Sequence, residues 1–469
     1  MPTSELEAPA FSAVLPVPSA SSPATSAAPV IPLEVAPAAH ITAATAPAWE
    51  DLAARFRPIF ERIAEGAVAR EQSRTLAHEP VAWLREAGFG AVRIPQAYGG
   101  LGATIPQLFR LLLELAEADS NVSHLFRGHF SFLEARLNIP DAASHARWFP
   151  QIAQGVVLGY AMAERTEHTG GSAKLICENG EYFVDGTKYY STGTIYADWI
   201  IVSLFEGEER VSVAVPVNAP GVTRLDDWDG FGQRLTGSGT TRFDRVRIGE
   251  DQIIRRFGPN DYLLSYQKSF LQLVLLASVA GVGRAVLRDG LEFVRPRTRA
   301  FGIPGKSSPK DDPLVQRVIG KVSSLAFSAE TLVLGIAQHL EDIYQLAQRG
   351  QATEADFVAT EIKAFQAQQI VLPQVLEAAT LVFEVGGASA TSEARRLDRH
   401  WRNARTAASH NPAIHREAAI GDYLLNGTVP DRAWREAFEK RAPTTTSDAV
   451  GPGRSAVQAG TDPSPQSGT

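Results

Sequence analysis

One segment of this 469-residue sequence resembles the glycine-rich turn of a dinucleotide-binding fold. Gly281-Val282-Gly283 follows an apolar stretch, as that turn does, but the third glycine of the fingerprint is missing. The apolar spacing on both sides also continues as one helix, whereas the fingerprint joins a strand to a helix. We therefore expect these glycines to allow close helix packing, and any nicotinamide chemistry to take place elsewhere.

The candidate metal ligands do not have the spacing of a known metal site. His78 is not followed by a second histidine four residues later, and Pro412 prevents His410 and His415 from sharing a simple helical face. The acidic run 226–230 does not match a calcium loop, so we interpret it as solvated turn carboxylates. No metal site is expected.

Three hydrophobic patterns define the elements that must position any site. Helical spacing of apolar residues predicts an N-terminal helical domain at 48–151. Strand-like runs bounded by turn residues predict a β domain at 152–260. Long helical patterns follow at 261–441, where Thr353 and Asp356 form a capping box at the start of one helix. Helices of this length usually pack as a bundle.

The chain ends and the overall composition exclude several classes of protein. Residues 1–47 contain no Lys or Arg and are rich in Ala, Pro and Ser, and residues 442–469 hold little apolar content, so both are interpreted as disordered tails. The formal charge is −7 and no basic cluster is present, which argues against nucleic-acid and anionic-membrane partners. Cys177 is the single cysteine, and no run approaches the roughly 18 apolar residues of a membrane span. A cytoplasmic protein is expected.

Six strings occur in an order and spacing that point to one family. They are Pro95–Gly102, Ala161–Ser172, Asp185–Lys188, Gly232–Thr240, Val385–Gly387 and Arg402–Arg405. Together they resemble the acyl-CoA dehydrogenase superfamily over nearly all of 48–430. The resemblance implies an α+β fold with an N-terminal helical domain, a central β-barrel and a C-terminal four-helix bundle. It also implies a flavin between barrel and bundle, and usually a homotetramer.

Within that superfamily the chain most resembles the flavin-dependent (group D) monooxygenases, a branch with the dibenzothiophene monooxygenases and sulfur-acquisition oxidoreductases. The strings that carry this are Ser123–Phe126, Tyr190–Gly193, Asp226–Trp228, Trp401–Thr406, His410–Pro412 and Leu425–Gly427. A dehydrogenase takes a proton from its thioester with a carboxylate base, but no Asp or Glu lies between Asp398 and Glu417. His410 stands there instead, and an imidazole can donate a hydrogen bond or move a proton near neutral pH.

The resemblance implies roles for single residues. His410, His124 and Thr192 would be catalytic, although His124 could equally be a core histidine. Arg299 would reach the flavin phosphate of a neighbouring subunit, and the aromatic face of Trp228 would pack on the flavin ring. The residues implied in cofactor binding are Tyr160, Met162, Ala163, Arg165, Lys188, Thr192, Trp228, Arg299, Phe301, Gly387 and Ser389.

Three departures from the dibenzothiophene monooxygenases imply a different pocket. Gly128 stands where those enzymes have a tyrosine, Tyr160 where they have an asparagine, and Ser389 where they have an arginine. Arg165 replaces another asparagine and could compensate for the lost arginine. Substrate identity therefore does not transfer from that branch.

The resemblance implies one component of a two-component monooxygenase. It would insert one oxygen atom from O2 into a small organic substrate, such as an organosulfur compound, through a flavin C4a-hydroperoxide. A separate NAD(P)H:flavin reductase would supply reduced FMN, with FAD as the alternative cofactor. The alternative functions are an FAD-dependent acyl-CoA-type dehydrogenase and a catalytically silent helical scaffold.

Overall fold

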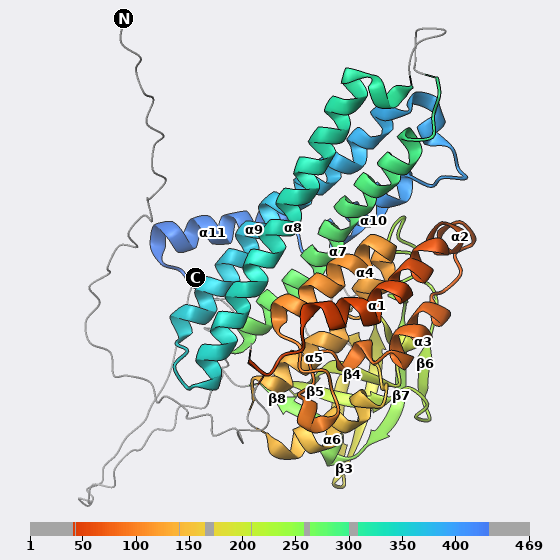
Figure 1. The fold of residues 1–469 in the computed structure, drawn as a ribbon. Coiled ribbons are helices and arrows are strands. Elements are labelled where there is room, and N and C mark those ends of the chain that lie inside the picture. The colour runs from red at the N-terminus through yellow and green to blue at the C-terminus, as the bar shows by residue number, and fades with distance from the viewer. Residues whose placement is uncertain are drawn as a thin grey trace, which may run out of the picture.

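The computed structural model describes residues 41–42, 44–139, 141–164, 173–207, 209–257, 263–299 and 308–430. The predicted site residues Arg165 and Phe301 lie outside these ranges, as do 1–40 and 431–469 of the predicted tails. Figure 1 shows a helical N-terminal region, a sheet, and long C-terminal helices. The helices are α1 (Trp49–Glu65), α2 (Ala67–Ser73), α3 (His78–Glu86), α4 (Ile105–Leu125), α5 (Arg127–Leu137), α6 (Ala142–Ala153), α7 (Leu263–Val294), α8 (Pro313–Gln348), α9 (Glu354–Leu381), α10 (Asp398–Ala408) and α11 (Ala413–Asn426).

Helix α4 carries one of the predicted site residues and bends before it reaches that residue. Thr104 caps the helix, and the Thr104 and Gln107 side chains form a reciprocal capping box. Asp119 leaves helical geometry, with φ −157° and ψ 108°, and its carboxylate accepts hydrogen bonds from Asn121 and Arg70. The last turn of α4, which ends in His124 and Leu125, therefore follows a kink.

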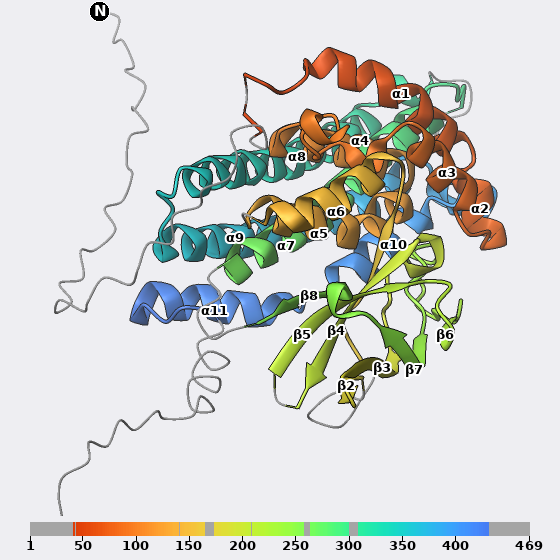
Figure 2. The same cartoon turned by 90° about the horizontal axis from the view of Figure 1, so that it is seen from below.

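The strands form one mixed sheet that lies as a layer on one side of the helices (Figure 2). Its strand order is β6-β7-β3-β2-β4-β5-β8, and β1 pairs in parallel with β4. Strand β4 is buried along most of its length, as expected for a central strand covered on both faces. The strands are β1 (Leu158–Ala161), β2 (Lys174–Glu178), β3 (Glu181–Lys188), β4 (Trp199–Glu206), β5 (Glu209–Pro216), β6 (Val222–Arg224), β7 (Thr241–Ile248) and β8 (Ile253–Arg256).

Helix α7 is the centre of the helical core and packs on α4, α8, α9 and α10. Gly281 lies inside this helix, and a Cβ atom at that position would lie 2.4 Å from the Cβ of Ala116 on α4. The glycine therefore permits the close approach of α4 and α7, as expected, and is not part of a strand-to-helix turn. The predicted capping box of Thr353 and Asp356 is also confirmed at the start of α9.

Two features differ from the expectations. Ile41 is buried, and Gln345 on α8 donates a hydrogen bond to its carbonyl, so the structured chain reaches back into the segment predicted as a tail. Both α7 and α8 are also long and apolar enough to cross a membrane, contrary to the prediction that no segment is. The α7 window is 83% buried in the protein, whereas the α8 window is 28% buried. Helix α8 therefore carries an apolar face, with Leu314 and Phe327 exposed.

Candidate active site

The two predicted catalytic histidines come together from distant parts of the chain. His124 lies in the last turn of α4 and His410 follows the end of α10. Their rings meet edge to face, with centroids 6.1 Å apart. Arg127, the first residue of α5, donates to Nε2 of His410 at 3.3 Å. These three side chains form the centre of the candidate site, which we call the histidine–arginine cluster.

His124 is buried with one ring nitrogen fixed and the other without a partner. Nδ1 lies 3.1 Å from Oε1 of Gln233. The Gln233 amide nitrogen donates to Ser120 and to the Asn403 carbonyl, so its oxygen accepts and the proton of His124 is on Nδ1. The lone pair of Nε2 has no partner among the described residues. Burial, helped by the charge of Arg127, lowers the pKa of His124 to about 4, so the ring is neutral at pH 7.

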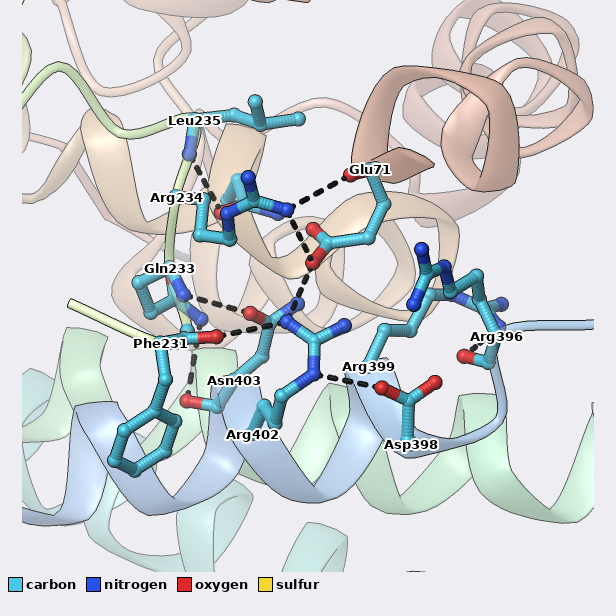
Figure 3. Close-up of polar contacts among 12 residues, drawn as sticks. Glu71, Phe231, Gln233, Arg234, Leu235, Arg396, Asp398, Arg399, Arg402 and Asn403 are labelled. Atoms are coloured by element: carbon cyan, nitrogen blue, oxygen red, sulfur yellow. Dashed lines mark hydrogen bonds and ion pairs between the residues drawn. The ribbon is translucent and has the colours of Figure 1, made fainter. Parts of the chain in front are cut away.

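Gln233 lies in a loop that is fastened to two helices (Figure 3). Its backbone N–H donates to Oδ1 of Asn403 at 2.6 Å. Arg402 donates to the Phe231 carbonyl and to the buried carboxylate of Glu71, both at 2.7 Å. Arg234 donates to the Glu71 carbonyl. These contacts from α10 and α2 hold Gln233, which has a φ of +51°, and thereby orient His124.

His410 is held by a second hydrogen-bonded chain. Because Arg127 donates to Nε2, the proton of the neutral ring is on Nδ1, which donates to Oδ1 of Asn411 at 3.3 Å. Asn411 in turn donates to Gln272 on α7 at 2.7 Å. Protein surrounds the ring closely, which lowers the pKa of His410 well below its usual value, and the charge of Arg127 acts in the same direction. The side chain nevertheless stays accessible to solvent. It is thus a loop residue with a fixed orientation.

Arg127 and Gln233 were not predicted. Arg127 donates through Nε to the Leu271 carbonyl at 3.0 Å, and no described carboxylate pairs with it. Burial lowers its pKa to about 10, partly opposed by Tyr160, so the guanidinium is charged at pH 7. The sequence contains no signal for either role, because a missing counter-charge and a positive φ are properties of the folded chain. Gln233 does lie inside the string Gly232–Thr240 that pointed to the family.

Thr192 belongs to a chain of hydroxyl groups that ends at the same loop. Its Oγ1 lies 2.8 Å from the Ser238 hydroxyl, which lies 2.7 Å from the Thr236 hydroxyl. Thr236 donates to the Gln233 carbonyl, so the donors run from Thr192 towards Gln233. Thr192 therefore offers lone pairs to a ligand.

The departures at Gly128 and Tyr160 are coupled. A Cβ atom at Gly128 would lie 2.6 Å from the Cβ of Tyr160, so the tyrosine needs a glycine at this position. The Tyr160 backbone N–H donates to the Thr192 carbonyl at 3.1 Å, and its phenol is hydrogen-bonded to Ser131. Burial raises the pKa of the phenol, which stays protonated at pH 7.

The remaining predicted residues near the sheet are engaged by protein groups. The Trp228 indole donates to the Gly232 carbonyl at 3.1 Å and its ring lies edge-on to Tyr190. Lys188 is buried in an ion pair with Glu164 and donates to the Met162 carbonyl. The Ala163 carbonyl accepts from the Tyr189 N–H.

The carboxylates predicted to be solvated are also engaged. Asp226 pairs with both terminal nitrogens of Arg74 at 2.9 Å, and Asp227 accepts twice from Thr240 at 2.7 Å. Among the described residues, no group of three or more His, Cys, Asp or Glu side chains could hold a metal ion.

Arg299, Gly387 and Ser389 lie far from the histidine–arginine cluster. They follow the C-terminal ends of α7 and α9, where Phe293 packs on Val385. The cluster contacts α7 near Gln272, and about 22 residues of helix at 1.5 Å each place Val294 roughly 33 Å away. A cavity of about 1030 Å³ between α1, α4 and α7 is lined by neither histidine.

Comparisons with known proteins agree on one family. The model of the acyl-CoA dehydrogenase N-terminal domain matches residues 50–156, and that of the C-terminal domain matches 273–413. The chain is 27% identical over 392 residues to a dibenzothiophene monooxygenase of Rhodococcus qingshengii, covering 80% of this chain and 93% of the relative. It is 26% identical over 385 residues to a probable FMNH2-dependent monooxygenase, SfnC, of Pseudomonas putida, covering 80% and 94%.

Solved structures give the same result. FMN-bound TdsC of Paenibacillus sp. A11-2 has a TM-score of 0.75 at 25% identity, covering 80% of this chain and 98% of that one. Methanesulfinate monooxygenase MsuC of Pseudomonas fluorescens has a TM-score of 0.73 at 25% identity, covering 80% and 97%. The predicted superfamily and fold are thereby confirmed. Because both domain models match in order and together cover more than half of it, the chain belongs to the acyl-CoA dehydrogenase superfamily.

Proposed function

We propose that this chain is a reduced-flavin-dependent monooxygenase with FMN as its cofactor. It inserts one oxygen atom from O2 into a small organic substrate. The relatives at 26–28% identity match over more than nine-tenths of their length and are named monooxygenases, one of them a probable FMNH2-dependent monooxygenase. The observation that carries the proposal is the neutral pair His124 and His410. It occupies the region where a dehydrogenase of the family would need a carboxylate base.

The polar groups around the cluster fit the polar edge of a flavin ring. His124 Nε2 is a buried acceptor without a partner, and Thr192 Oγ1 has free lone pairs. Trp228 and Tyr190 offer aromatic surface beside them. Reduced FMN, when bound, supplies the electrons that activate O2. The protein's part is to orient the reactants, exclude water and hold a proton at His410 Nδ1.

A separate NAD(P)H:flavin reductase completes the proposed system. The glycines that resemble a dinucleotide fingerprint lie in the middle of α7, where Gly281 packs on α4 and Gly283 lies against α8 and α9. In this proposal reduced FMN comes from another protein, and the exposed lone thiol of Cys177 suits the reducing cytoplasm in which such a reductase works.

The protein is proposed to be a homotetramer. Leu314 and Phe327 on α8 are each 71% exposed in the single chain, which leaves a large apolar surface uncovered. Arg299, Gly387 and Ser389 lie at the far end of the bundle and would serve the flavin of a neighbouring subunit. Obligate interfaces commonly bury more than about 2,000 Å². Light scattering at micromolar concentration should report four chains, and a monomer would refute the assembly.

Isotope transfer tests the activity directly. The purified chain, with FMN and a flavin reductase, is supplied with ¹⁸O2 and a panel of small organosulfur compounds. We expect one ¹⁸O atom per product molecule, and no bleaching of enzyme-bound oxidised flavin by saturated acyl-CoA thioesters. Bleaching by a thioester would instead support the FAD-dependent dehydrogenase.

A further inference from the structure

Arg127 differs from four other largely buried arginines of this molecule in having no described counter-charge. Four largely buried guanidinium groups each pair with a carboxylate, namely Arg70–Asp119, Arg93–Glu134, Arg399–Asp289 and Arg402–Glu71. Arg127 pairs with no described acid, and its described hydrogen-bond partners are the Leu271 carbonyl and the neutral ring of His410. A charge removed from water without a partner is costly, and folded proteins rarely keep one without a use.

The neighbours of Arg127 do not neutralise it either. His124 and His410 are both neutral at pH 7, partly because the guanidinium repels a second positive charge. The stretch 399–416 that passes beside the cluster contains no Asp or Glu. The cluster therefore carries one net positive charge in a closely packed region where Coulomb interactions are stronger than in water.

One end of the guanidinium remains available to a ligand. Nε donates to the Leu271 carbonyl and Nη1 donates to His410. Nη2 donates to no described residue, and it keeps some contact with solvent. The neighbouring His410 side chain is also accessible to solvent. A planar guanidinium with free N–H groups matches the two oxygens of a small oxyanion.

We propose that Arg127 binds the anionic group of the substrate, so that this enzyme oxidises a small organosulfur anion of the sulfinate class in preference to a neutral sulfur compound. The inference rests on the proposed function, because it names the substrate class of the same site. Relatives of both kinds exist, since dibenzothiophene is uncharged and methanesulfinate is an anion. Arg127 places this chain with the second kind.

The step balances with the reactants of the proposed reaction. One oxygen atom of O2 forms a new S–O bond, which oxidises sulfur by two electrons and turns the sulfinate into a sulfonate. The O–O bond breaks, and the second oxygen atom leaves as water with two electrons and two protons from reduced FMN. The substrate keeps its single negative charge throughout, so Arg127 can hold it from binding to release.

Binding measurements on the full-length chain loaded with oxidised FMN test the assignment without relying on turnover. Methanesulfinate is compared with dimethyl sulfoxide, a neutral oxidisable molecule of similar size, by calorimetric titration. Arg127→Gln removes the charge, Arg127→Lys keeps it, and Arg57→Gln is a matched control at an exposed arginine outside the cluster. We expect Arg127→Gln to weaken methanesulfinate binding by about 10- to 100-fold, the usual loss for a hydrogen bond to a charged group. Arg127→Lys should recover part of this loss, and FMN affinity should not change.

The outcomes separate this inference from the function on which it rests. Unchanged methanesulfinate affinity in Arg127→Gln overturns the inference, and so does an equal loss of FMN affinity, which would assign Arg127 to the cofactor. If Arg127→Gln does not fold, the wild-type protein still decides, because equal affinity for dimethyl sulfoxide and methanesulfinate also overturns it. Transfer of ¹⁸O to neutral sulfur compounds alone would refute the anionic substrate but would still support the proposed monooxygenase function. Transfer to no compound, with FMN bound, would refute the monooxygenase itself.

Discussion

Two inward-facing arginines in neighbouring parts of this molecule have opposite surroundings. Arg93 makes a bidentate ion pair with Glu134, and each side chain is 1% exposed. Tyr266 donates to the same carboxylate and the Ala103 carbonyl accepts from the guanidinium. Every charge in this group has a partner within the fold. Arg127 has a carbonyl and a neutral imidazole instead.

The difference distinguishes a group that holds the fold together from one that is ready for a ligand. A fully paired buried ion pair is strongly destabilised when one partner is lost, because the other charge is left without compensation. An unpaired charge is already in that state, so its removal costs the fold little. Stability measurements and activity measurements should therefore give opposite rankings for the two regions.

The largest effect is expected for His410→Ala. His410 touches no residue of the Arg93 group, so the fold and FMN affinity should be nearly unchanged. Loss of one catalytic acid or hydrogen-bond donor typically lowers a rate by about 10² to 10⁴. Oxygenation should fall while reduced FMN still consumes O2, so the ratio of product to hydrogen peroxide should drop. An unchanged ratio and turnover would make His410 an ordinary loop residue.

Glu134→Gln and Arg127→Gln form a direct test of the comparison. Glu134→Gln should lower the free energy of unfolding by about 3–5 kcal/mol, because Arg93 is left buried and unpaired. Arg127→Gln should change it by less than about 1 kcal/mol, since no carboxylate loses its partner. Denaturant unfolding of both variants gives the two values. Equal losses would show that Arg127 is also structural.

The pH dependence of stability compares two buried histidines in the same way. Burial lowers the pKa of both His124 and His129 to about 4. Since the unfolded chain binds these protons first, the stability they contribute is complete above about pH 6.5 and is lost as the pH falls towards 4, by at most about 3 kcal/mol each. His124→Gln should therefore flatten the decline of unfolding free energy below pH 6.5.

His129 provides the control for that measurement. Both of its nitrogens are used, one donating to the Gly90 carbonyl and the other accepting from the Leu158 N–H. His129→Gln should consequently destabilise the protein at neutral pH as well, because buried groups lose their partners. If His124→Gln is equally destabilising at pH 7, the unpartnered Nε2 of His124 has a structural role after all.

Local rules predicted the elements well and the site in part. The capping box of α9 and the continuous helix through Gly281 depend on neighbours along the chain, and both are confirmed. His124 and His410 were identified through family resemblance, and the fold brings them together. Arg127 could not be identified from the sequence. What sets it apart is the lack of a carboxylate partner, and only the tertiary structure shows which groups lie beside it. The kink at Asp119, which precedes the turn that carries His124, likewise has no signal in a helical pattern.

The smallest effect is expected at Thr192, where the hydroxyl chain connects the sheet to the loop of Gln233. If Thr192 accepts a hydrogen bond from the ligand and donates to Ser238, then Thr192→Val removes both and should lower product formation by roughly 10-fold, the equivalent of one neutral hydrogen bond of about 1.4 kcal/mol. Thr192→Ser keeps the oxygen and should retain most of the activity. Because the chain runs through Thr236 to the Gln233 carbonyl, the Val variant should also weaken the hold on that loop. Product yield and amide hydrogen exchange at 231–236 are measured on both variants. A fully active Thr192→Val variant would show that Thr192 takes no part in the reaction, and the polar site would then consist of the two histidines and Arg127.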